Sequence, residues 1–181
     1  MLMQRLSLEV PVLQAPMAGV TTPRLAAAVS EAGALGSLGI GAMTVSAARD
    51  AIRQTRQLTP RPFGVNVFCH QSVPLPAREA ADWLHWLKPE FKRFGARPPE
   101  TLRQIYASFL DGSAMLDMLL EERPACVSFH FGLPGAAAVQ SLKDAGITLL
   151  ASVTNEQEAK LAERAGMDVL IAQGYGAGGH R

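Results

Sequence analysis

Short apolar segments alternate with helical patterns along most of the chain, and this alternation constrains the fold more than any other feature. Helices end in Ala-Gly just before an apolar run at Ala32-Gly33, Ala145-Gly146 and Ala165-Gly166. Strands separated by single helices at this spacing form parallel sheets. Six apolar runs have the length and composition of buried strands: residues 10–13, 35–40, 63–68, 125–129, 148–153 and 169–172.

Each predicted strand is followed by polar or glycine-rich residues at its C-terminal side. This pattern favours an α/β fold of the TIM-type (β/α)8 barrel class, truncated after about six strands, over a doubly wound sheet. A dinucleotide-binding sheet would carry Gly-x-Gly-x-x-Gly after its first strand, and that pattern is missing after residues 10–13. We therefore expect residues 1–181 to form one partial barrel.

One excursion, at about residues 69–111, interrupts the strand–helix rhythm. Within it one helical stripe, interrupted by Pro89, is formed by Trp83, Leu87, Phe91 and Phe94. Long excursions inside compact domains are usually functional or disordered, and the aromatic residues favour packed structure. An elaborated loop or lid at the barrel mouth and plain core packing both remain open.

Capping residues locate three of the predicted helices. Thr21 or Thr22 precedes Pro23, and Thr44 precedes a helix that runs to about Thr59. The arginines of this second helix are expected on its solvated side: Arg49, Arg53 and Arg56. A third helix is expected to open at Thr154, with Gln157 completing a capping box.

Composition excludes several classes of function. The chain has 17 basic and 16 acidic side chains and a net charge of +1, so no strong field favours nucleic acid or a membrane surface. No run approaches the roughly 18 apolar residues that span a bilayer. Cys69 and Cys126 have no metal-binding spacing and are expected to be buried thiols of a cytoplasmic protein. No acidic pair or His/Cys cluster has catalytic or metal-ligand spacing, which disfavours metal-assisted hydrolysis.

The final stretch of the sequence has the composition of a ligand-binding loop. The predicted strand 169–172 is followed by Gln173, a glycine-rich segment, His180 and Arg181. Glycine lets a backbone approach a ligand closely, and successive free N–H groups favour an anion. Such loops at the C-terminal ends of parallel strands hold ligands in α/β enzymes. A binding loop in this position suggests a piece of a longer protein.

Other polar side chains also follow predicted strands. His130 comes directly after the strand 125–129, and its ordinary pKa suits a general base near neutral pH. It could instead be a structural histidine that holds a loop carbonyl, and for His180 a loop-fixing role is favoured. Asn66 and Gln173 can both donate and accept hydrogen bonds, which suits the imide edge of a planar heterocycle.

Four segments together resemble the nitronate monooxygenase family, formerly called 2-nitropropane dioxygenases: residues 14–19, 63–67, 128–132 and 172–181. Members are FMN-dependent TIM barrels that oxidise alkyl nitronates with O₂ to a carbonyl compound and nitrite. The resemblance implies that His130 is catalytic and that Tyr106 and His180 lie at the substrate pocket. It also implies an FMN site formed by Pro16, Met17, Asn66, Gln173, Gly178 and Gly179.

The sequence departs from the family pattern in two places. Gly176 stands where a glutamate usually precedes Ala-Gly-Gly-His, and the loops after strands seven and eight, which hold the flavin phosphate in such barrels, are absent. Two alternatives follow. One is a related flavin reductase of the enoyl-thioester or NADH:quinone type, although the segment 128–132 favours the monooxygenase. The other is a non-catalytic truncated chain that binds flavin weakly or not at all.

Overall fold

The structure is a computed structural model that describes residues 2–102 and 104–180. It divides into two compact units, which we describe separately. The first comprises Met1–Gln71 together with Tyr106–Arg181, and the second comprises Ser72–Ile105.

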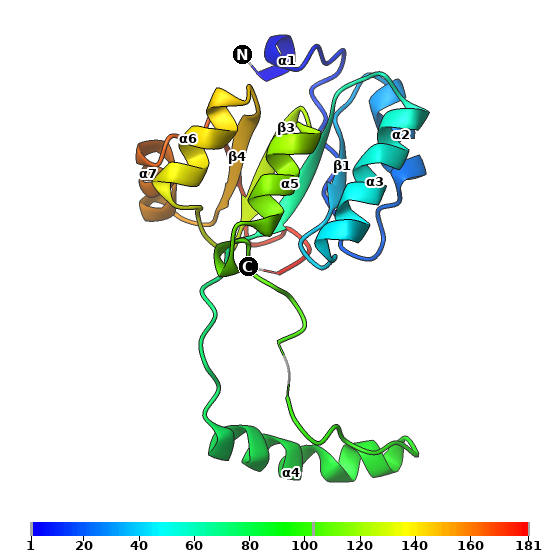
Figure 1. The fold of residues 1–181 in the computed structure, drawn as a ribbon, viewed down its shortest axis with the longest axis vertical. Coiled ribbons are helices and arrows are strands. Elements are labelled where there is room, and N and C mark those ends of the chain that lie inside the picture. The colour runs from blue at the N-terminus through cyan, green and yellow to red at the C-terminus, as the bar shows by residue number, and fades with distance from the viewer. Residues whose placement is uncertain (1, 103, 181) are drawn as a thin grey trace. The chain divides into compact units, whose positions relative to one another are not determined.

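The first unit is built on a parallel sheet with helices packed against it (Figure 1). Each strand pairs with the next one along the chain, which is the sequential order of a (β/α) barrel, whereas the strand order of a doubly wound sheet reverses. Within the described residues the sheet has five strands: β1 (Gly36–Gly39), β2 (Phe63–Phe68), β3 (Cys126–His130), β4 (Thr148–Val153) and β5 (Val169–Ala172).

The sequence prediction of a strand at residues 10–13 is wrong. Leu13 forms only an isolated parallel bridge to Leu35. Two backbone hydrogen bonds hold it there, from the Leu35 N–H to the Val12 carbonyl at 3.0 Å and from the Gln14 N–H to the Leu35 carbonyl at 2.9 Å. Pro11 has no N–H to extend the ladder, which limits pairing along this edge of the sheet.

The helices of the first unit follow the sequence pattern closely. The side chains of Thr22 and Thr44 accept backbone N–H groups and cap α2 and α3, as expected. The predicted cap of α7 is wrong, because Asn155 caps that helix and Glu158 occupies the position expected for Gln157. The elements are α1 (Leu2–Arg5), α2 (Pro23–Glu31), α3 (Val45–Leu58), the 3-10 turn η1 (Phe109–Asp111), α5 (Ala114–Glu122), α6 (Ala136–Asp144) and α7 (Glu156–Arg164).

The main hydrophobic core lies between the sheet and the helices that cover it. Its fully buried side chains include Leu38 and Phe129 from the strands and Ile52 and Met118 from the helices. A second, smaller cluster joins Leu6, Leu8, Leu35, Cys126 and Leu150. Because Arg5 of α1 pairs with Asp168, just before β5, this cluster lies towards the amino-terminal ends of the strands. The carboxyl ends of the strands are therefore free of this cluster and can carry polar residues.

The three arginines of α3 are not simply solvated. All three bind the carboxylate of Glu122 on α5, whose side chain is only 5% exposed. Arg49 Nη1 lies 3.2 Å from Oε1, Arg53 Nε lies 2.7 Å from the same oxygen, and Arg56 Nη1 lies 2.9 Å from Oε2. Arg56 also donates to the Glu122 carbonyl. This cluster pins α3 to α5 on the outer side of the sheet.

The second unit contains one long helix, α4 (Ala77–Arg93). It begins before the aromatic stripe expected from the sequence and includes Pro89. Trp83 and Trp86 stack with ring centroids 4.9 Å apart, and α4 has no buried residue. Among the described residues, no helix has both the length and the apolar character that crossing a bilayer requires.

Candidate functional site

Three of the polar residues singled out from the sequence lie at the carboxyl ends of β2, β3 and β5. Asn66 pairs in register with Ser128, and Phe68 pairs with His130, the last residue of β3. Gln173 follows β5 directly. Since all strands are parallel, these residues meet at the same edge of the sheet.

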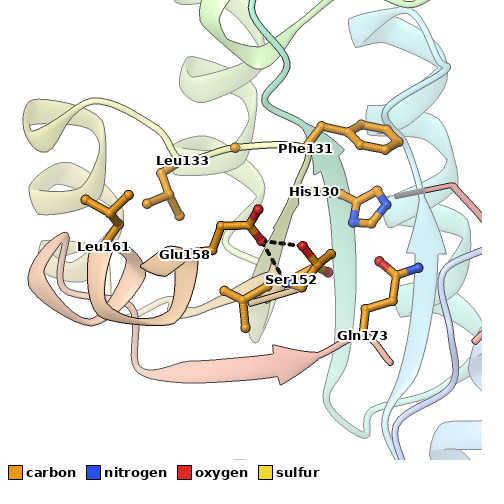
Figure 2. Close-up of a pocket in the computed structure, with 10 residues that line it drawn as sticks. His130, Phe131, Leu133, Ser152, Glu158, Leu161 and Gln173 are labelled. Atoms are coloured by element: carbon orange, nitrogen blue, oxygen red, sulfur yellow. Dashed lines mark hydrogen bonds between the residues drawn. The ribbon is translucent and has the colours of Figure 1, made fainter. Parts of the chain in front are cut away.

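A cavity of about 480 Å³ opens beside His130 and Gln173. Figure 2 shows these two side chains close together, with Leu133 and Leu161 at the other end and Glu158 between. A mainly apolar wall with a few convergent polar groups is the usual composition of a small-molecule site. The lining residues are His130, Phe131, Gly132, Leu133, Ser152, Val153, Thr154, Glu158, Leu161 and Gln173.

The glycine-rich loop after β5 is tied to the site through one carbonyl. His130 Nε2 lies 2.8 Å from the His180 carbonyl oxygen, and Gln173 Nε2 donates to the same oxygen at 3.1 Å. Gln173 Nε2 also lies 3.4 Å from the Gly178 carbonyl oxygen. The loop is therefore fixed by the backbone of His180. The imidazole of His180 is exposed and does not line the cavity.

The other end of the Gln173 amide is unpaired. Its Oε1 atom is buried and has no hydrogen-bond partner among the described residues. A buried acceptor left without a donor costs about 1–3 kcal/mol, so native structures rarely keep one without a reason. An N–H group on a bound ligand would satisfy this oxygen, which fits the expectation of a planar heterocycle.

Asn66 is buried, and its amide nitrogen is already engaged. Nδ2 donates to the Ser128 carbonyl at 3.1 Å and to Ser128 Oγ at 2.8 Å. These bonds fix the amide across β2 and β3. The oxygen Oδ1 is the end of the side chain that could accept a hydrogen bond from a ligand.

The Pro16-Met17 segment is packed against the end of β1. A Cβ on Gly39 would lie 2.8 Å from the Ala18 nitrogen, so this close approach requires glycine. The Met17 N–H donates to Thr21 Oγ1 at 3.1 Å, and the Met17 side chain is partly exposed. The backbone donor of Met17 is thus used within its own loop.

The two expected flavin-binding glycines lie in the exposed part of the loop. A Cβ on Gly178 would meet nothing within 4 Å, so the backbone there is open to close approach by a ligand. Gly179 has a φ of +86°, a left-handed conformation that glycine adopts at little cost.

Tyr106 is connected to the site through a chain of aromatic rings. Its ring contacts Phe68 edge-on, with centroids 5.7 Å apart, and Phe68 lies 5.3 Å from Phe131. Phe131 in turn packs against His130 at 4.0 Å. Tyr106 is not among the residues that line the cavity.

Most residues of the cavity wall were not identified from the sequence, and two of them, Phe131 and Glu158, have features that bear on the site. Phe131 has a left-handed φ of +68°, which is strained for a bulky side chain and is typical of functional sites. Glu158 accepts hydrogen bonds from the Thr154 N–H at 2.6 Å, Thr154 Oγ1 at 3.0 Å and Asn155 Nδ2 at 2.9 Å. The backbone bond from Thr154 holds the pKa of Glu158 below its usual value, so the cavity wall carries a fixed anion. An asparagine at the helix N-cap followed three residues later by a glutamate, Asn155 and Glu158, is the signal that could have located it.

The described residues contain no cluster of three or more His, Cys, Asp and Glu side chains that could hold a metal ion.

Comparison with known proteins shows which family the sequence matches. The sequence matches the nitronate monooxygenase family over residues 1–181. It is 57% identical over 180 residues to a nitronate monooxygenase of Paraburkholderia phytofirmans, covering 99% of this chain and 49% of that protein. It is 53% identical over 177 residues to one of Pseudomonas aeruginosa, covering 97% and 50%.

Solved structures agree on the fold. Nitroalkane oxidase from Streptomyces ansochromogenes superposes with a TM-score of 0.87 at 40% identity, covering 99% of this chain and 50% of that one. FabK from Thermotoga maritima superposes with a TM-score of 0.70 at 33% identity, covering 99% and 45%. The parallel sheet is thus part of a TIM-type barrel, as expected. The chain spans about half the length of the curated relatives it matches. It belongs to the nitronate monooxygenase family.

Proposed function

We propose that the whole protein oxidises alkyl nitronates with O₂, using FMN, to a carbonyl compound and nitrite. The observation that carries this proposal is that His130 and Gln173, from different strands, meet at one cavity in a chain of this family. The names of the relatives support the reaction class.

The residues present suit a flavin. Gln173 Oε1 is a buried acceptor with no donor among the described residues, and Asn66 Oδ1 can accept a hydrogen bond, so both suit the N–H and amide edge of the ring system. Gly178 and Gly179 expose backbone at which a ligand can approach closely. FMN is favoured over FAD because no Gly-x-Gly-x-x-Gly follows residues 10–13 or β1. When bound, the flavin supplies the electron-transfer chemistry.

His130 removes a proton from the substrate. A neutral nitroalkane carries an acidic hydrogen on the carbon that bears the nitro group, and an imidazole at the cavity wall can remove it. A nitronate has already lost that proton, so towards it His130 acts as a hydrogen-bond donor. Positioned bases of this kind contribute about 10²–10⁴-fold to a rate.

The rest of the cavity favours one orientation of the substrate. Leu133, Val153 and Leu161 provide an apolar wall that suits the alkyl chain. The fixed carboxylate of Glu158 repels an anionic nitronate group from that end of the cavity. The nitro group is therefore directed towards His130.

A related flavin reductase remains the second candidate, because FabK shares the fold at 33% identity. One assay separates the two candidates. The full-length protein reconstituted with FMN is supplied with preformed propane 2-nitronate, and O₂ uptake and nitrite are measured. A parallel sample receives an enoyl thioester and NAD(P)H. Nitrite release with O₂ uptake is the expected result. Oxidation of NAD(P)H by the thioester without nitrite would establish the reductase instead.

A further inference from the structure

The contact between His130 and the glycine-rich loop determines which nitrogen of the imidazole carries a proton. A carbonyl oxygen has no hydrogen to donate, so at 2.8 Å from the His180 carbonyl oxygen Nε2 must be the donor. A neutral histidine has one protonated nitrogen, and the hydrogen bond made by one nitrogen fixes the state of the other. Neutral His130 is therefore the Nε2–H tautomer, and its acceptor is Nδ1.

Nδ1 is free to act. Among the described residues only the His180 carbonyl bonds to the His130 ring, and the ring lies on the cavity wall. The nitrogen that can take up a proton is thus the one that has no partner.

We propose that His130 takes the substrate proton on Nδ1, and that Gln173 is a positioning residue that acts by holding the His180 carbonyl on Nε2. The chemical part of this inference rests on the proposed function, whereas the tautomer and the role of Gln173 rest on the geometry alone.

The proton step balances without any further reactant. The C–H bond next to the nitro group breaks, its proton goes to Nδ1 of His130, and its electron pair remains on the substrate as the nitronate. His130 becomes an imidazolium whose Nε2–H still points at the His180 oxygen. A carbonyl dipole in this position stabilises the new positive charge and keeps the ring aligned, as a carboxylate does behind other catalytic histidines.

Gln173 is suited to hold this carbonyl. Its Nε2 lies 3.1 Å from the His180 oxygen and 3.4 Å from the Gly178 oxygen, so one amide spans the turn that presents both carbonyls. Gly179, between them, has the left-handed φ of +86° that the turn requires. The same side chain points its unpaired Oε1 away from these bonds. Binding of a ligand and alignment of the base therefore depend on one residue.

Nitrogen NMR of the full-length, flavin-free protein labelled with ¹⁵N-histidine tests the geometry directly. The signals of His130 are identified by their loss in His130→Asn. In the neutral ring, Nε2 is expected to be pyrrole-type and Nδ1 pyridine-type. The opposite pattern, or a mixture of tautomers in the parent, would overturn the proposal.

Three variants test the positioning role. Gln173→Leu removes the amide and is expected to give a tautomer mixture. Gly179→Val cannot adopt the left-handed turn and is expected to do the same, whereas Gly179→Asn tolerates that conformation and should restore the parent pattern. Thermal melts identify any variant that fails to fold. If one does, the tautomer pattern of Gly179→Asn compared with that of Gly179→Val decides whether the left-handed turn matters. Parent-like spectra in both Gln173→Leu and Gly179→Val would contradict the role of Gln173.

Kinetics of the FMN-loaded protein add a second readout. Losing the carbonyl behind the imidazolium leaves the ring of His130 misaligned. The kcat/KM for neutral nitroalkane should therefore fall about tenfold in Gln173→Leu, whereas oxidation of preformed nitronate, which needs no proton removal, should change less. Equal losses for the two substrates, or no loss for neutral nitroalkane, would contradict the positioning role. If the predicted tautomer is found but no nitronate is oxidised by any variant or the parent, the proposed function fails and the geometric inference stands.

Discussion

Asn66 and Ser128 are joined across β2 and β3 by a hydrogen bond of 2.8 Å from Nδ2 to Oγ. A second bond from Nδ2 to the Ser128 carbonyl, at 3.1 Å, leaves the amide nitrogen fully committed to the sheet. The amide is thereby fixed with its oxygen as the end available to a ligand. Asn66 does not line the cavity, and Gln173, which does, adds a second amide oxygen that can accept a hydrogen bond from a ligand.

The first prediction follows from these acceptors. The full-length protein should purify with FMN, because a flavin ring offers an N–H to Gln173 or Asn66 and no Gly-x-Gly-x-x-Gly follows residues 10–13. Heat release followed by chromatography identifies the flavin. Recovery of FAD, or a well-folded protein that neither contains nor takes up any flavin, would count against the assignment.

The second prediction concerns Glu122, which binds the three arginines of α3. Replacing it in Glu122→Gln should lower the free energy of unfolding by about 1–3 kcal/mol, since charge-assisted hydrogen bonds to a buried carboxylate are lost. The matched control is Glu121→Gln. Glu121 also pairs with Arg49, but its own side chain is 60% exposed. That change should cost less than about 1 kcal/mol. Denaturant unfolding measures both, and equal losses would contradict the cluster's role.

The third prediction gives the pH dependence of the same cluster. Burial of Glu122 raises its pKa, but hydrogen bonds from Arg56 and Arg53 outweigh burial and hold the pKa below its usual value. A carboxylate with a depressed folded-state pKa stabilises the protein above its unfolded pKa of about 4.3, and this contribution is lost as the pH falls through the folded-state value. The gap in melting temperature between parent and Glu122→Gln should therefore be widest near neutral pH and narrow in acid. A gap that widened in acid would be inconsistent with this sign.

The fourth prediction concerns the thiols. Cys69 and Cys126 are free and buried, and burial raises the pKa of each to about 12. Because the thiolate is the reactive form, neither should react appreciably with a thiol reagent in the native protein at about pH 8. Both should react once the chain is unfolded in denaturant. Rapid labelling of either residue under native conditions would show that its surroundings are more open.

Much of the fold could be predicted from local patterns. The strands Phe63–Phe68, Thr148–Val153 and Val169–Ala172 have the bounds expected from their continuous apolar runs. The strand expected at residues 10–13 failed because an apolar composition does not reveal whether an edge segment containing Pro11 can complete a ladder.

The site was harder to predict because its decisive contacts are non-local. The sequence placed His130 at a strand end and allowed it either to be a base or to hold a loop carbonyl, and the structure shows that it bonds to a carbonyl 50 residues away. No local pattern gives that pairing. The left-handed backbone conformation of Phe131 could not be predicted either, since tertiary packing imposes a conformation that phenylalanine does not favour by itself.

The most direct test of the account is the activity of His130→Asn in the full-length, FMN-loaded protein. Turnover of neutral nitroalkane should fall by about 10²–10⁴ while FMN stays bound, and oxidation of preformed nitronate, which needs no proton removal, should fall much less. A variant that stays folded and flavin-loaded and oxidises neutral nitroalkane at the parent rate would show that His130 is not the base.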